Sequence, residues 1–115
     1  MLVVKCWKPA KIIRVVDGDT IDVTIDLGLG LSLTDRVRVL NFDAAETWRP
    51  RNQAERQHGI EATQFATELL KHPFWVSYEK RGSFGRILVD IKLSDGRDFA
   101  TVMKENGMEK RPTYD

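Results

Sequence analysis

The alternation of side chains over residues 20–27 constrains the fold more than any other feature of this sequence. Polar and apolar residues follow one another there without a break: Thr20, Ile21, Asp22, Val23, Thr24, Ile25, Asp26 and Leu27. A period of two is typical of a strand that has one face on a core and the other in solvent. We therefore expect a half-buried strand, with its apolar side chains lining a core, in an antiparallel sheet.

Further short β-prone runs precede and follow this strand. They are predicted over residues 2–7, 12–16, 36–42, 74–80 and 86–93. The period changes once: apolar residues at three- and four-residue spacing indicate an amphipathic helix from about Ala54 to Lys71, stopped by Pro73. A short second helix is expected after Asp98, which can cap it, with a stop at Asn106-Gly107.

This order of elements predicts one domain over residues 1–115, mainly β with α (α+β). No helical crossover separates the early strands, which argues against a parallel α/β sheet. We expect a five-stranded OB-fold barrel with a helix after strand four and a short C-terminal helix. The run over residues 2–7 is then an extra strand or part of strand one.

Two glycine-marked turns are expected in the first part of the chain. Between Asp17 and Thr20 the chain must reverse, and Gly18 is suited to a positive φ. The loop Gly28–Ser32 carries unusually apolar residues, so it either folds over the barrel or contacts a partner; the first interpretation is favoured.

Composition limits the class of partner and the compartment. The formal net charge is +1, so a nucleic acid would have to be held by local clusters of arginine and lysine. Cys6 is the one cysteine, and we expect it to be buried and inert. The sequence as given has no signal peptide and no membrane span, which predicts a soluble, cytoplasmic protein without a membrane partner. A monomer is expected.

Three carboxylates lie near predicted strand ends: Asp19, Asp43 and Glu46. Hard oxygen ligands without a cluster of His or Cys indicate Ca²⁺ or Mg²⁺ and disfavour zinc. The two histidines, His58 and His72, are expected to be solvated residues of the helix or its end.

Two arginines, Arg38 and Arg86, suit the chemistry of a phosphodiester. Guanidinium groups donate paired hydrogen bonds to the oxygens that gain charge in the transition state, and a carboxylate such as Glu46 could take a proton from the attacking water. Taken singly, each of these residues is better explained as surface or turn. Arg38 in particular could face outward or pair with one carboxylate.

Four segments together resemble the staphylococcal nuclease (thermonuclease) family over nearly the whole chain. They are the acidic turn Val16–Thr20, the Arg-x4-Asp-x2-Glu segment from Arg38 to Glu46, the helix Glu55–Leu70 and the aromatic-Gly-Arg turn Phe84-Gly85-Arg86. The resemblance implies an OB-fold barrel and a Ca²⁺-dependent endonuclease, with Mg²⁺ or Mn²⁺ as alternative ions. Its products from DNA and RNA would carry 3′-phosphates.

The resemblance also implies a role for each site residue. Asp19 and Asp43 would bind Ca²⁺ with the main-chain carbonyl of Ala44, and Glu46 would activate or position the water. Arg38 would bind the scissile phosphate, and Arg86 would stabilise the transition state. Substrate contacts are expected from a further set of residues: Arg49, Lys80, Arg81, Phe84 and Tyr114.

This chain departs from the family at two places. Ala44-Ala45 stands where family members often have Thr-Pro, which should loosen the loop that carries Glu46. The C-terminal tail is short, with at most Tyr114 in reach of a phosphate. The function expected is a nuclease with little sequence specificity and a preference for single strands. The alternatives are a non-catalytic OB-fold module that binds nucleic acid or protein, and a fragment completed by a partner chain.

Overall fold

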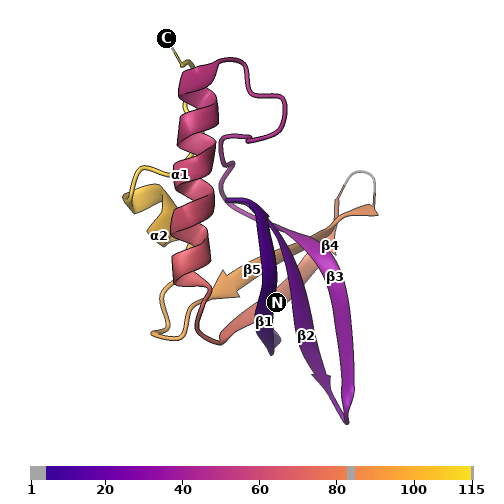
Figure 1. Ribbon diagram of the computed structural model, residues 1–115. Helices are drawn as coiled ribbons and strands as arrows, with labels where there is room; N and C mark the ends of the chain where they lie inside the picture. Colours follow the sequence, from indigo (N-terminus) through magenta and orange to yellow (C-terminus); the bar gives the residue numbers. More distant parts are fainter. Residues whose placement is uncertain (1–4, 83–84, 115) are drawn as a thin grey trace, which may run out of the picture.

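In the computed structural model, described over residues 5–82 and 85–114, the chain forms five strands and two helices (Figure 1). In chain order they are β1 (Trp7–Asp17), β2 (Thr20–Gly28), β3 (Leu31–Val39), α1 (Gln53–Leu69), β4 (Phe74–Arg81), β5 (Ile87–Lys92) and α2 (Phe99–Glu105). None of the helices in the described part of the chain is both long and apolar enough to cross a membrane.

The five strands close into a barrel in the order β1-β2-β3-β5-β4. All neighbours are antiparallel except β3 and β5, which pair in parallel from Val37 with Ile87 to Val39 with Val89. A closed five-stranded barrel of this kind confirms the predicted OB-fold class. α1 follows the third strand and not the fourth. Of the strand predicted over residues 2–7, only Trp7 lies in a strand, β1, while Lys5 and Cys6 precede it and residues 2–4 lie outside the described residues.

That single strand, β1, changes partner part-way along its length. Trp7 to Ala10 pair with β4, and Ala10 to Asp17 pair with β2. Pro9 lies in the section that has a ladder on one side only, where its missing N–H is tolerated. The interruption expected at residues 8–11 is therefore absent.

The hairpin of β2 and β3 confirms the alternating pattern near the barrel and contradicts it at the tip. Ile21 and Val23 are fully buried, whereas Leu27 is 46% exposed. The loop from Gly28 does not fold over the barrel: the hairpin projects away from it (Figure 1). β3 also ends earlier than predicted, before Asn41, whose φ of 75° leaves the strand conformation.

Both helices lie on one side of the barrel and complete its core (Figure 1). The predicted face of α1 is confirmed: Ala62, Ala66 and Leu70 are buried, with Phe65 and Leu69 packed against the core. α2 begins after Asp98, whose side chain accepts from the amide of Thr101. α2 ends at its C-cap, Asn106, so both ends of this helix follow the capping signals predicted from the sequence.

Two expectations about single side chains are wrong and one is met. Cys6 is exposed, because it precedes β1 and is not part of the barrel core. His58 is only 3% exposed, since it faces the C-terminal tail and not solvent. His72 is exposed, as expected.

Candidate active site

The turn between β1 and β2 requires glycine because other parts of the chain approach it closely. A Cβ atom built at Gly18 would lie 2.9 Å from the Cβ of Ala44 and 3.2 Å from the Cβ of Ala62. The φ of Gly18 is not positive, so the expected reason for this glycine is wrong. The turn is fixed by packing against α1 and against the loop after β3. It thereby positions Asp19 beside Ala44 of this loop.

Asp19 is 9% exposed, and its carboxylate has three partners. Oδ2 accepts from the amide of Ala44 at 3.0 Å and from Nη2 of Arg38 at 3.3 Å, and Oδ1 accepts from the hydroxyl of Thr20 at 3.1 Å. Burial raises the pKa of Asp19, and the Ala44 amide and the Arg38 charge oppose that rise.

Arg38 joins two carboxylates. Its Nη2 donates to Asp43 as well as to Asp19, and Nη1 donates to the carbonyl of Val39 at 3.2 Å. The Arg38 side chain is 19% exposed and that of Asp43 is 73% exposed. Arg38 therefore does not simply face outward. Its guanidinium is paired at the end of β3 with two carboxylates, the buried Asp19 and the exposed Asp43.

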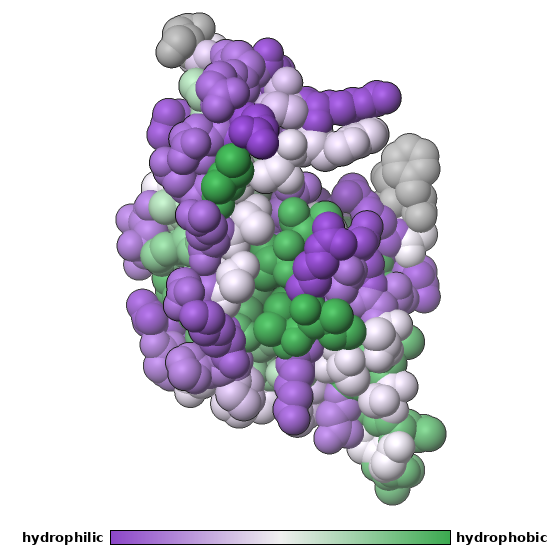
Figure 2. Space-filling model, viewed as in Figure 1, coloured by the Kyte–Doolittle hydropathy of each residue, from purple (hydrophilic) through white to green (hydrophobic). Residues whose placement is uncertain are grey.

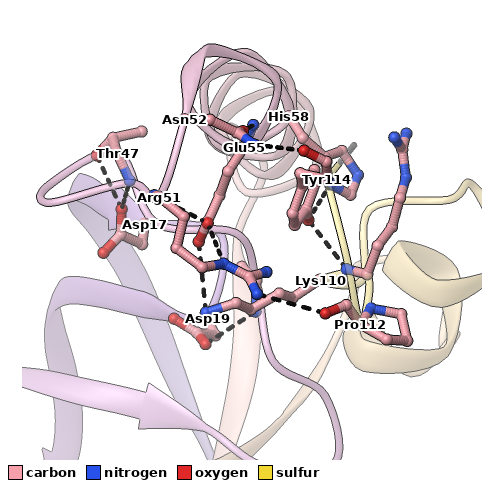
Figure 3. Close-up of polar contacts among 12 residues, drawn as sticks. Asp17, Asp19, Thr47, Arg51, Asn52, Glu55, His58, Lys110, Pro112 and Tyr114 are labelled. Atoms are coloured by element: carbon pink, nitrogen blue, oxygen red, sulfur yellow. Dashed lines mark hydrogen bonds and ion pairs between the residues drawn. The ribbon is translucent and has the colours of Figure 1, made fainter.

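The loop that carries Glu46 is held from two sides. Asp17 accepts from the amide of Thr47 at 3.2 Å and from its hydroxyl at 2.9 Å (Figure 3). On the other side, a Cβ built at Gly59 of α1 would lie 2.9 Å from the carbonyl oxygen of Glu46. Ala45 is completely buried. The loop is thus anchored from both sides, while the loosening expected from Ala44-Ala45 stays a prediction.

These groups surround one polar pocket of about 300 Å³. It is lined by Asp17, Asp19, Thr20, Arg38, Asp43, Ala44, Glu46, Arg86 and Lys110. Every residue that the sequence assigned to catalysis or metal binding lines this pocket. Glu46 and Arg86 are both exposed there. The pocket gathers three cationic side chains and four carboxylates from distant parts of the chain.

The C-terminal tail forms one side of the pocket. The amide of Lys110 donates to the carbonyl of Asp43 at 2.7 Å, and Glu109 forms a β-bridge with Ala44. Nζ of Lys110 lies 3.4 Å from Oε1 of Glu55, whose side chain is 1% exposed. The tail is therefore paired with Asp43 and Ala44, two residues that line the pocket.

Tyr114 anchors this tail on α1. It is 5% exposed, and its hydroxyl lies 2.7 Å from Nδ1 of His58 and accepts from the amide of Arg111 at 2.9 Å (Figure 3). Nε2 of His58 donates to the carbonyl of Gly107 at 2.8 Å, since a carbonyl only accepts. The buried imidazole therefore bridges Tyr114 and the backbone of Gly107 through its two ring nitrogens.

Glu55 joins the tail to the start of α1. Nε of Arg51 donates to its carboxylate at 2.8 Å and the Arg51 amide at 3.1 Å, while Asn52 caps the helix by accepting from the amide of Glu55. The Arg51 hydrogen bond, with help from Lys110, lowers the pKa of Glu55 to about 2. This carboxylate stays ionised and holds a cation on each side.

With this geometry established, comparison with known proteins identifies the family. A family model described as a staphylococcal nuclease homologue matches residues 36–114, which is more than half of the chain. The chain belongs to this family. A search of the curated proteins found no match. Asp19 precedes the matched residues 36–114. The folded barrel places it in contact with Arg38 and Ala44, which lie within the match.

The two aspartates fit a hard divalent cation. Both accept from the same nitrogen of Arg38, so their oxygens converge on one cationic position. Among the described residues, no three His, Cys, Asp or Glu side chains are grouped so that they could hold an ion by themselves. A Ca²⁺ or Mg²⁺ ion at Asp19 and Asp43 would therefore complete its shell with water, a main-chain oxygen or a phosphate oxygen.

The residues predicted to bind substrate do not gather in this pocket. Lys80 and Arg81 are at the end of β4, and Arg81 donates to the carbonyl of Gly85 at 2.7 Å. Arg49 lies over the ring of Trp48 on the exposed loop before α1. Tyr114 is buried on α1, away from the pocket lining. Phe84 lies outside the described residues.

Sequence reasoning missed the residues that hold the site together. Asp17 was taken for a turn residue, His58 for a solvated one, and Glu55 for an ordinary member of the helix. For Glu55 a signal existed, because Asn52 and a glutamate three residues later have the spacing of a capping box. For His58 and Tyr114 the partners are 56 residues apart, and no local pattern relates them.

Proposed function

We propose that this protein is a Ca²⁺-dependent nuclease that hydrolyses DNA and RNA with little sequence specificity and prefers single strands. One observation carries the proposal: Arg38, Arg86 and Glu46 line the same pocket as the convergent carboxylates Asp19 and Asp43. Family membership supports a nuclease-like or nucleic-acid-binding function, and the pocket supports the first of these.

In the proposed reaction, water attacks phosphorus and the bond from phosphorus to the 5′-oxygen breaks, which leaves a 3′-phosphate and a 5′-hydroxyl. Glu46, exposed in the pocket, accepts a proton from the water or orients it. Arg86 donates to the oxygens that gain charge and stabilises the leaving oxygen, which takes its proton from solvent. Arg38, already oriented by two carboxylates, binds the scissile phosphate.

A divalent ion bound at Asp19, Asp43 and the carbonyl of Ala44 would neutralise charge on the phosphate oxygens. Metal binding can be measured apart from activity. Calorimetric titration with Ca²⁺ should give one site, and Asp19→Asn or Asp43→Asn should abolish it.

The central experiment is cleavage of single-stranded DNA with Ca²⁺ and with a chelator. Glu46→Gln and Arg86→Ala should each lower kcat by about 100- to 1000-fold, which is the usual loss when one charged group leaves such a site. Matched controls are Glu61→Gln on the exposed face of α1 and Arg97→Ala in the turn before α2. Cleavage by Glu46→Gln at the wild-type rate would refute the catalytic assignment.

The products provide a second readout. Fragments with 3′-phosphates should resist extension by a template-independent polymerase until they are treated with a phosphatase. Binding to phosphates should weaken steeply with salt and depend little on sequence. Extension without phosphatase would contradict the proposed direction of cleavage.

The second candidate function is a barrel that binds nucleic acid without cleaving it. It is favoured by the engagement of Arg38 with both aspartates, since a salt bridge of this kind is stable without a metal ion. This function predicts binding of oligonucleotide without cleavage across a series of Ca²⁺, Mg²⁺ and Mn²⁺. The same protein preparation and substrate distinguish the two functions.

A further inference from the structure

The tip of the β2–β3 hairpin exposes four leucines. Their exposed fractions are 46% for Leu27, 101% for Leu29, 62% for Leu31 and 38% for Leu33. Figure 2 shows hydrophobic surface, interspersed with residues of intermediate hydropathy, at the far end of the hairpin, at the lower right of the view. A concentration of exposed apolar side chains at one tip indicates an interaction site on soluble proteins.

The backbone adds a second, independent observation at Leu29. The φ angles of Gly28, Leu29 and Gly30 are 86°, 56° and 78°. Glycine adopts such angles readily, but leucine is disfavoured there. Leu29 therefore combines a strained backbone with a completely exposed apolar side chain. Strain of this kind is concentrated at functional positions.

A pocket of complementary character lies at the base of the same hairpin. All five strands and Cys6, just before β1, contribute to this apolar pocket of about 460 Å³, which is the open mouth of the barrel. Its lining is Cys6, Lys8, Ile25, Leu27, Leu33, Val76, Tyr78, Arg81, Ile87 and Val89. On β1, β2 and β3 it lies at the opposite end from the polar pocket.

The charges around tip and mouth are of opposite sign. Asp26 and Asp35 flank the leucines and are exposed, while Lys8 and Arg81 belong to the mouth. Within the part of the chain that the structure describes, none of these four side chains forms an ion pair with another side chain. The tip of one molecule therefore matches the mouth of another in both polarity and charge.

We propose that two copies of this chain form a symmetric dimer, in which the leucine tip of each hairpin enters the barrel mouth of the other. Leu27 and Leu33 belong to the tip and also line the mouth, so the two surfaces are continuous. A two-fold axis beside these residues would bury the tip and the mouth of each copy in one interface. The interface replaces the monomer expected from the sequence. It leaves both polar pockets open.

The test is sedimentation velocity of the full chain over a micromolar to millimolar series. Wild type should shift from 13.2 kDa to twice that mass. Leu29→Asn suits the positive φ and removes the apolar side chain, so it should keep or raise the melting temperature while raising the dissociation constant about 100-fold. The matched control Ile13→Asn changes an exposed apolar residue outside the mouth, 55% exposed, and should dimerise as wild type does.

Three results would overturn the proposal. One is a wild type that stays monomeric throughout the series, which would leave the tip for a different protein. Another is a Leu29→Asn variant that dimerises as tightly as wild type. The third is a variant without residues 1–4 that dimerises much more tightly than the full chain, because the mouth would then be a site for the chain's own N-terminal residues.

Discussion

The anchoring of the C-terminal tail by one buried hydroxyl can be tested with a single atom change. Tyr114→Phe removes the oxygen that contacts His58 at 2.7 Å and the Arg111 amide at 2.9 Å. Two hydrogen bonds of about 0.5–1.5 kcal/mol each are lost, and Nδ1 of His58 remains buried without its hydrogen-bond partner. We expect a cost of about 2 kcal/mol to the docked tail.

The loss of tail stability should reach the candidate active site through Lys110, whose amide donates to the carbonyl of Asp43. Its hydrogen exchange should accelerate by about 30-fold if the tail opens locally. If the tail opens only with the whole domain, the urea midpoint should fall by about 1 M. Both measurements are made on the same variant, and one of them must change.

The chain contains its own control for this substitution. Tyr78 is the only other tyrosine and is 60% exposed, so Tyr78→Phe makes the same chemical change without a buried partner. It should leave both the exchange rate and the urea midpoint unchanged. Equal behaviour of the two variants would refute the view that Tyr114 holds the tail.

Three further predictions concern Glu55, Gly18 and Asp17. The pKa of Glu55 falls from 4.5 to about 2 on folding, so its contribution to stability is complete above pH 4.5 and is lost as the pH falls toward 2; Glu55→Gln should flatten this limb of a urea-stability profile against pH. Gly18→Ala should destabilise the protein by about 1–3 kcal/mol, and Ala44→Gly should restore part of the loss, because the two Cβ atoms would clash at 2.9 Å. Asp17→Ala should release the Glu46 loop and lower kcat of the proposed cleavage, whereas Asp95→Ala, which breaks an exposed pair, should not.

Much of the fold could be predicted because its signals are local. The period of two over β2, the three- and four-residue spacing over α1 and the cap at Asp98 each depend on neighbours in the sequence. The errors have equally local causes. Pro9 suggested a break between two strands, but β1 continues because that part of the strand has only one neighbour.

The sequence by itself determined which chemical groups are available: Arg38, Asp43 and Glu46 on one segment, Asp19 on a turn and Arg86 beside a glycine. Only the tertiary structure decided how they are held. The Asp17–Thr47 bond, the Gly18 contacts and the His58–Tyr114 anchor all join residues far apart in the chain. Such contacts depend on closure of the barrel and on the position of α1, and no local periodicity encodes them. The leucine tip is a further example, because only the closed barrel shows that these apolar residues lie outside the core and are exposed.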